Sequence, residues 1–168
     1  MFFVRSKEQI PCPCCNGELK VIGSRHRGYI DGTGAKIILI IRRLRCCNCE
    51  RIHHELPDIL VPYKRHSSES IEASIDGNSN LSAPADESTI RRWRYWFQTM
   101  CNYFSGCLLS IAIRYERKSA EEKTSLPSSK LQRIWQQVGD APGWLARLVR
   151  PIANLNLWIH TRSAFLSG

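Results

Sequence analysis

The sequence predicts an α+β protein in which a metal-stapled β-hairpin module is followed by a mainly α-helical, helix-turn-helix-like unit. Two C-x2-C pairs, Cys12 with Cys15 and Cys46 with Cys49, flank a pattern of strand, turn and strand, and they predict the first module. Apolar residues that recur at helical spacing predict the second unit.

The four paired cysteines have the spacing of a tetrahedral metal site. Two residues between the cysteines of a pair let a tight turn aim both sulfurs at one ion, ~2.3 Å away. Asn16 and Gly17 follow the first pair as residues that tolerate positive φ, which such a turn needs. Cys14 and Cys47 lie inside the pairs and are expected to be free thiols.

Zinc is the expected ion, and the first module is then a zinc ribbon. Four thiolates, from Cys12, Cys15, Cys46 and Cys49, leave no open position for water, so the expected Zn2+ is structural. An iron centre of the rubredoxin type uses similar pairs and is the alternative. The basic, hairpin-like segment between the pairs favours zinc.

A β-hairpin is expected between the two cysteine pairs. Residues 19–30 ("LKVIGSRHRGYI") and the stretch from Lys36 ("KIILIIRRLR") favour strands, and "DGTG" at 31–34 is a turn signal. A unit of this size buries little core, so metal binding is expected to supply much of its folding energy.

Basic residues of the hairpin predict a surface that contacts phosphate groups. By the two-residue period of a strand, Arg25 and Arg27 share one face. Three further arginines crowd the end of the next strand, and residues 64–66 ("KRH") follow later. The alternative is a solvated edge that offsets thiolate charge. The expected contacts on the ribbon are Arg25, Arg27, Arg42, Arg43 and Arg45.

Two domains are expected, a zinc ribbon over 1–66 and a helical domain over 67–168. In the second, a short helix is predicted near 69–75 and a longer one at 88–104 with Ser88 as its N-cap. One face of the longer helix is apolar. The opposite face carries basic residues, which is the division that a DNA-recognition helix requires. An ordinary packing helix with a solvated basic face is the alternative. The expected contacts are Arg91, Arg92 and Arg94.

The rest of the chain predicts two further helices. Apolar spacing places one at 131–138, capped by Ser128 or Ser129, and another at 144–152, which Pro151 is expected to bend or end. The charged segment 116–129 predicts an exposed connection. Cys101 and Cys107 lie in an apolar stretch and are expected to be buried.

Composition favours a polyanionic partner. The chain of 168 residues has 24 Lys and Arg against 15 Asp and Glu, a formal charge of +9. It shows neither a cleavable leader nor an apolar run of about 18 residues, so a cytoplasmic protein without membrane attachment is expected. "HHELPD" lacks the second histidine of the H-E-x-x-H motif, and we find no catalytic constellation, so no enzymatic activity is expected.

Several stretches resemble an uncharacterised bacterial family, classed as a domain of unknown function. They are "PCPCCNGELKVIGSR", "RRLRCCNCERIHHELPDILVPYKRH", "STIRRWRYWF" and "WIHTRSAFLSG". Residues 10–66 and the helix at 88–97 are also similar to the zinc-binding heads and DNA-binding helices of insertion-sequence transposases. The resemblance implies metal ligation by the four paired cysteines and a nucleic-acid surface formed by the basic residues. The catalytic domain of a transposase has no counterpart here.

The expected function is non-catalytic DNA binding in a mobile-element or transcriptional regulatory setting. The alternative is a protein-interaction adaptor for a transposase, recombinase or polymerase. Five tryptophans, at least four of them in predicted helices, suit such an adaptor as well as they suit a helical core.

Overall fold

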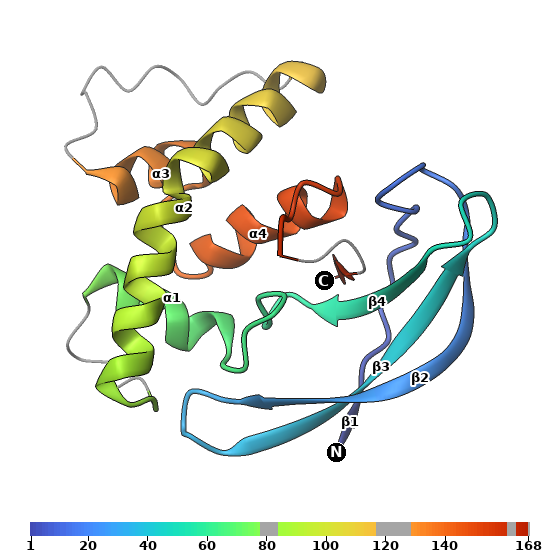
Figure 1. Ribbon diagram of the computed structural model, residues 1–168, viewed down its shortest axis with the longest axis horizontal. Helices are drawn as coiled ribbons and strands as arrows, with labels where there is room; N and C mark the ends of the chain where they lie inside the picture. Colours follow the sequence, from blue (N-terminus) through green and yellow to red (C-terminus); the bar gives the residue numbers. More distant parts are fainter. Residues whose placement is uncertain (78–83, 117–128, 161–163, 168) are drawn as a thin grey trace.

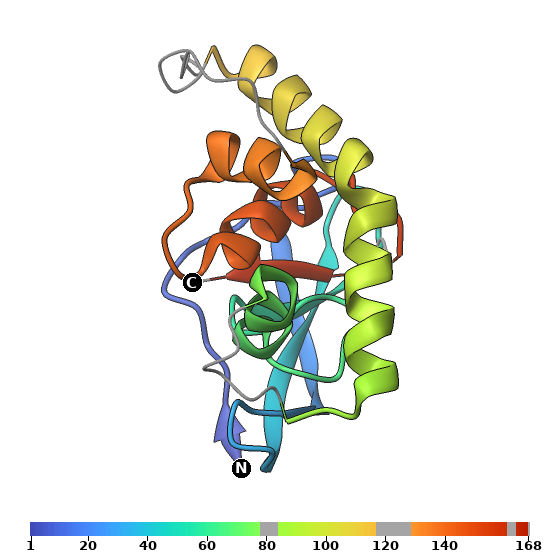
Figure 2. The same ribbon diagram turned by 90° about the vertical axis from the view of Figure 1, so that its left-hand side faces the viewer.

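The computed structural model describes residues 1–77, 84–116, 129–160 and 164–167, and it places the helices on one side of a sheet (Figures 1 and 2). The strands are β1 (Phe2–Phe3), β2 (Leu19–Ile30), β3 (Lys36–Cys46), β4 (Ile52–Pro57) and β5 (Ala164–Ser167). The helices are α1 (Ser68–Asp76), α2 (Glu87–Arg114), α3 (Lys130–Val138) and α4 (Trp144–Asn154). The predicted α+β class, with strands before helices, is confirmed apart from the terminal strand β5.

Strand β3 is the central strand of the five-stranded sheet. Strand β2 pairs with it antiparallel along its whole length, from Leu19 opposite Cys46 to Ile30 opposite Lys36. The other edge of β3 is shared, because β1 pairs in parallel with its earlier part and β4 pairs antiparallel with its end. Strand β5 then pairs in parallel with β4.

The predicted hairpin is confirmed, with the turn where the sequence placed it. One carboxylate oxygen of Asp31 accepts hydrogen bonds from the backbone N–H groups of Thr33 and Ala35, each 2.9 Å long. Gly34 takes a φ of 89°, which glycine adopts without a steric penalty. These local interactions fix the register of β2 and β3, and so bring the two cysteine pairs to the same end of the hairpin.

Strands β4 and β5 were not predicted, for two different reasons. In β4 the buried residues His53 and Glu55 are polar, so the segment lacks an apolar alternation. The buried carboxylate of Glu55 accepts two hydrogen bonds from the guanidinium of Arg42 in β3, at 2.5 and 2.7 Å. Strand β5 is short, and the side chain of Asn154 in α4 fixes it by bonding both the N–H and the carbonyl of Leu166.

One hydrophobic core joins the sheet to the helices. Leu39 and Ile41 of β3 and Leu166 of β5 belong to the same buried cluster as Phe97 of α2 and Trp144 of α4. Both ends of the chain therefore contribute to one sheet and one core. The division into two domains at residue 66 stays a prediction.

Helix α2 begins earlier and runs further than predicted. Its N-cap is Asp86, whose carboxylate accepts a 2.7 Å hydrogen bond from the N–H of Thr89, so the predicted cap Ser88 lies inside the helix. The predicted apolar face is confirmed, and Cys101 and Cys107 are buried on it as expected.

Helices α3 and α4 agree with the predicted segments. Ser129 caps α3, while Pro151 lies inside α4 without ending it. The glycine that caps α4 provides no side chain, and the carboxylate of Glu72 in α1 accepts the N–H groups of Gly143 and Leu145 instead. Of the connection predicted at 116–129, residues 117–128 lie outside the described residues.

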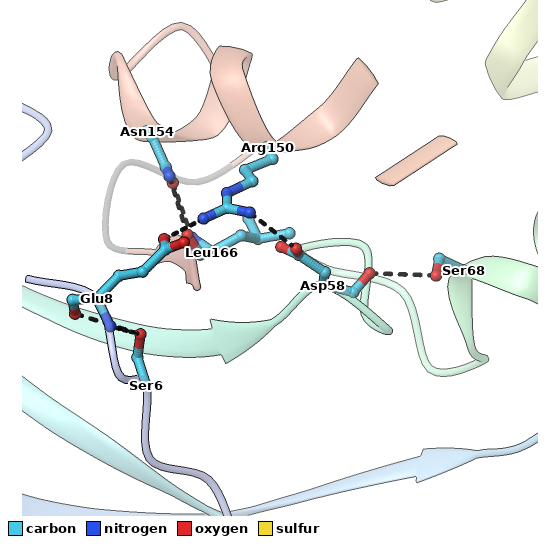
Figure 3. Close-up of polar contacts among 7 residues, drawn as sticks. All are labelled: Ser6, Glu8, Asp58, Ser68, Arg150, Asn154 and Leu166. Atoms are coloured by element: carbon cyan, nitrogen blue, oxygen red, sulfur yellow. Dashed lines mark hydrogen bonds and ion pairs between the residues drawn. The ribbon is translucent and has the colours of Figure 1, made fainter. Parts of the chain in front are cut away.

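Arg150 of α4 joins the N-terminal segment to the loop after β4 (Figure 3). Its guanidinium forms ion pairs with Glu8 and with Asp58, the latter at 3.2 Å. This contact holds the N-terminal segment, which leads to Cys12, against the helical side of the molecule. None of the described helices combines the length and apolarity that a bilayer span demands.

Candidate metal centre

The two cysteine pairs form turns with the same backbone pattern at one end of the β2–β3 hairpin. In the first turn the N–H of Asn16 donates to the carbonyl of Cys12 at 2.9 Å, and in the second the N–H of Glu50 donates to the carbonyl of Cys46 at 3.2 Å. Asn16 and Glu50 both have positive φ, at 63° and 59°. The two turns are therefore equivalent, and each aims two sulfurs at the other.

Gly17 is required for a reason that the sequence did not indicate. Asn16 takes the positive φ, whereas Gly17 is not among the residues that do. A Cβ atom on Gly17 would lie 2.7 Å from the amide nitrogen of Asn48 and 3.0 Å from the sulfur of Cys46. The missing side chain therefore lets the second turn approach the first.

Four sulfur atoms, from Cys12, Cys15, Cys46 and Cys49, lie within 4.8 Å of one another and could hold a metal ion. The distance between the sulfurs of Cys12 and Cys49 is 3.7 Å, and that between Cys15 and Cys46 is 3.4 Å. Four sulfurs bound tetrahedrally at ~2.3 Å from one ion lie ~3.8 Å apart. The cluster therefore fits a four-coordinate ion.

Cysteine ionisation differs across this cluster. Burial raises the pKa of Cys12 to about 12, because a thiolate there loses its hydration. The backbone N–H groups of Cys49 and Asn48 lower the pKa of Cys46 to about 6, because they donate hydrogen bonds to its sulfur. A bound cation would stabilise all four thiolates, since coordinated thiols lose their protons.

His53 is the residue near the cluster that the sequence interpretation missed. Its Nε2 atom lies 3.3 Å from the sulfur of Cys12, and the side chain is fully buried. Cys12, Cys14 and His53 form a second group able to hold a metal ion, although it offers three ligands rather than four. The sequence offered a signal for this residue, because His53 comes four positions after Cys49, close enough to reach the same metal ion.

The surplus cysteines lie outside the four-sulfur cluster. The guanidinium of Arg51 donates a 3.3 Å hydrogen bond to the sulfur of Cys14, and Cys47 is exposed. Neither of them forms a disulfide with a described residue. That both are free thiols, without a metal, stays a prediction.

The five hairpin arginines have different surroundings. Arg25 and Arg27 of β2 lie opposite Ile41 and Leu39, so they share the face that carries the helices. The side chain of Arg42 is held by Glu55 on the same sheet. Arg45 pairs at 3.2 Å with Glu50 of the second cysteine turn, and Arg43 lies opposite His54 of β4.

The arginines at the start of α2 are exposed and have local partners. Arg91 pairs with Glu87 at 3.3 Å, Arg92 donates to Ser88, and Arg94 donates to the carbonyl of Ser74 in α1. The segment 77–86 separates α1 from α2, which is longer than the turn of about 3–4 residues in a helix-turn-helix motif. The helix-turn-helix assignment stays a prediction.

A set of cations that we call the basic cluster lies between β2 and the loop before α1; its members are Arg25, Arg27, Lys64 and Arg65. The guanidinium of Arg27 donates a 2.7 Å hydrogen bond to the carbonyl of Lys64, and the ammonium of Lys64 lies 4.3 Å from the ring centroid of Trp96. Burial lowers the pKa of both Arg27 and Lys64. Among the described residues, the basic cluster makes no ion pair with a carboxylate.

The fold and the cysteine cluster define an α+β protein with a four-cysteine site, formed by two C-x2-C turns at the end of a hairpin. Residues 12–93 match the family model described as domain of unknown function DUF6431. The match includes all four cysteines and ends inside α2. Searches of the curated proteins and of the solved structures gave no match. The similarity to transposase zinc-binding heads stays a prediction.

We predict that Cys12→Ser and Cys49→Ser each abolish metal binding, while Cys14→Ser and Cys47→Ser leave one ion per chain. The physical reason is that the first two substitutions remove a ligand from the four-sulfur cluster, whereas the last two change sulfurs outside it. Metal content measured by mass spectrometry of the purified variants checks this. Loss of the ion in Cys14→Ser and His53→Ala, with retention in Cys49→Ser, would instead assign the three-ligand group.

We predict that Gly17→Ala weakens metal binding about tenfold or more in competition with a chelator. The new methyl group must displace Asn48 or the sulfur of Cys46, and such overpacking costs about 1–3 kcal/mol. Adding Asn48→Ala removes one of the two close contacts and should restore part of the affinity. The restoration is incomplete because the contact with the sulfur of Cys46 remains. Gly106→Ala in α2 is the control, since no atom lies within 4 Å of its added Cβ. Equal affinities for all three variants would show that the turns are not this closely fitted.

Proposed function

We propose that the protein is a cytoplasmic, non-catalytic DNA-binding protein whose hairpin is stabilised by a structural zinc ion. The observation that carries the proposal is the basic cluster. It brings four basic residues together with no carboxylate partner among the described residues, and two of the four are half-buried. Desolvated charges without counter-ions are unfavourable, so a polyanion is the partner that would relieve this cost.

Zinc is proposed as the ion because the cluster offers four thiolates and the surrounding strands are basic. If the ion is held by Cys12, Cys15, Cys46 and Cys49, no coordination position is left for a substrate, which supports a structural role. One zinc ion bound by four thiolates would give the site a formal charge of −2, which nearby arginines would offset. An iron-loaded, red preparation would contradict the choice of zinc and favour an electron-transfer centre.

The basic cluster is a better candidate for the main DNA contact than the start of α2. Arg91 is already paired with Glu87, and Arg92 and Arg94 bond neighbouring oxygens. We therefore propose that α2 supports the contact loop, and that its arginines add a second, weaker phosphate contact.

A protein-interaction adaptor is the second candidate. Leu109 and Ile113 in the last turns of α2 are 54% and 71% exposed, and they are one helical turn apart. Exposed apolar side chains at this spacing are typical of a face that binds another protein. Binding through that face would respond little to salt, whereas DNA binding falls steeply as salt rises.

We predict that Arg25→Ala with Arg65→Ala lowers duplex DNA affinity at least tenfold near physiological salt. Each lost phosphate contact should reduce the slope of log affinity against log salt by ~0.9. Both side chains are exposed, so the double variant is expected to fold normally. Fluorescence anisotropy across a salt series measures both quantities.

The matched control is Arg91→Ala with Arg92→Ala, which removes the same charge from α2 and should have the smaller effect. A larger loss of DNA affinity in Arg91→Ala with Arg92→Ala would mean that the main DNA contact is the predicted recognition helix. If the unsubstituted protein shows no salt-dependent binding to duplex or single-stranded DNA, the proposal of DNA binding fails.

A further inference from the structure

A strained turn projects an exposed tyrosine beside the basic cluster. The N–H of Lys64 donates a 3.0 Å hydrogen bond to the carbonyl of Val61, which closes a four-residue turn over 61–64. Pro62 occupies the second position, and Tyr63 in the third has a φ of 75°. This is the pattern of a type II turn, whose third position is normally glycine or asparagine.

The strain at Tyr63 is not offset by packing. A residue with a side chain costs roughly 1–2 kcal/mol in the left-handed conformation. The ring of Tyr63 is 76% exposed, and it makes no ring contact or side-chain hydrogen bond with a described residue. The turn needs a positive φ at this position, but the ring itself stabilises nothing in the described fold, which points to a role for the ring outside the fold.

The loop that carries Tyr63 is held firmly against the rest of the protein. The N–H of Ile30 donates to the carbonyl of Arg65 at 2.8 Å, and the N–H of Ser67 donates to the carbonyl of Ile30 at 2.9 Å. The ring of His66 packs edge-on against Trp93 of α2, with centroids 4.8 Å apart. The position of Tyr63 is therefore fixed before any ligand binds.

Basic residues flank Tyr63 along the chain and contact its loop from the neighbouring strand. Lys64 and Arg65 follow Tyr63 directly, and the guanidinium of Arg27 bonds the carbonyl of Lys64. Duplex DNA covers both faces of each base by stacking, so an exposed ring finds no base face there. An unpaired nucleotide offers a base to stack on the ring and a phosphate for the neighbouring cations.

We propose that residues 61–65 and Arg27 form a site for single-stranded nucleic acid, in which Tyr63 stacks on an unpaired base. This inference rests on the proposed function, because it specifies the form of nucleic acid that the basic cluster binds. It adds that bases, as well as phosphates, contribute to the affinity.

The test compares Tyr63→Gly and Tyr63→Phe with the unsubstituted protein. The probes are fluorescently labelled oligo-dT and oligo-rU, a duplex of equal length, and inorganic polyphosphate, which has the charge but no bases. Tyr63→Gly should bind the two single strands about tenfold more weakly, the loss expected for one stacked base, while its affinity for duplex and polyphosphate stays unchanged. Tyr63→Phe keeps the ring and should bind nearly as well as the unsubstituted protein. Tighter binding of either oligonucleotide than of the duplex supports the site.

Two controls separate this role from a structural one. Glycine is the favoured residue at a positive φ, so the melting temperature of Tyr63→Gly should be equal or higher. Tyr95→Ala removes an aromatic ring on α2 that is 73% exposed, and it should leave single-strand binding unchanged.

Three outcomes would overturn the inference. Unchanged single-strand affinity in Tyr63→Gly would mean that the ring contacts no base, while duplex binding would leave the proposed function intact. A parallel loss of polyphosphate binding would mean that the substitution displaces the neighbouring cations, and not that it removes a stacked base. Absence of binding to every nucleic acid by the unsubstituted protein would remove the proposed function and this inference together.

Discussion

The close approach of four cysteine sulfurs is the constraint on which the strand half of the molecule depends. Within 4.8 Å of one another, four thiolates repel unless a cation lies between them. The hairpin register, the two equivalent turns and the missing side chain at Gly17 all serve this approach. Through the first turn, the cluster also fixes the N-terminal segment that Arg150 holds from the helical side.

Strand β2 connects the candidate metal centre to the basic cluster. It begins at Leu19, opposite Cys46, and its Arg25 and Arg27 then point toward the helices. At its end, Ile30 bonds the loop that carries the remaining cations. The cation positions thus depend on the same hairpin register that brings the cysteines together, so a shift in that register would disturb both sites.

Features set by nearby residues could be predicted from the sequence, and those set by distant partners could not. The hairpin and the four candidate ligands follow from alternation, a turn signal and cysteine spacing. Helices α2, α3 and α4 follow from apolar period, although the cap of α2 is Asp86 and not the predicted Ser88. Strand β4 was missed because His53 and Glu55 are buried beside partners far along the chain. Strand β5 was missed because it depends on the side chain of Asn154. The positive φ at position 63 was missed because the residue there is a tyrosine, whereas a glycine would have indicated such a turn.

Hydrogen exchange of the metal-loaded and chelator-treated protein tests the central claim most directly, namely that one ion holds the two cysteine turns together. If the claim is correct, removing the metal exposes the amides of Cys12, Asn16, Cys46 and Cys47 to fast exchange. The amides of α2 and α4, which pack in the shared core, should stay protected. Equal protection of the cysteine turns with and without the ion would contradict the account.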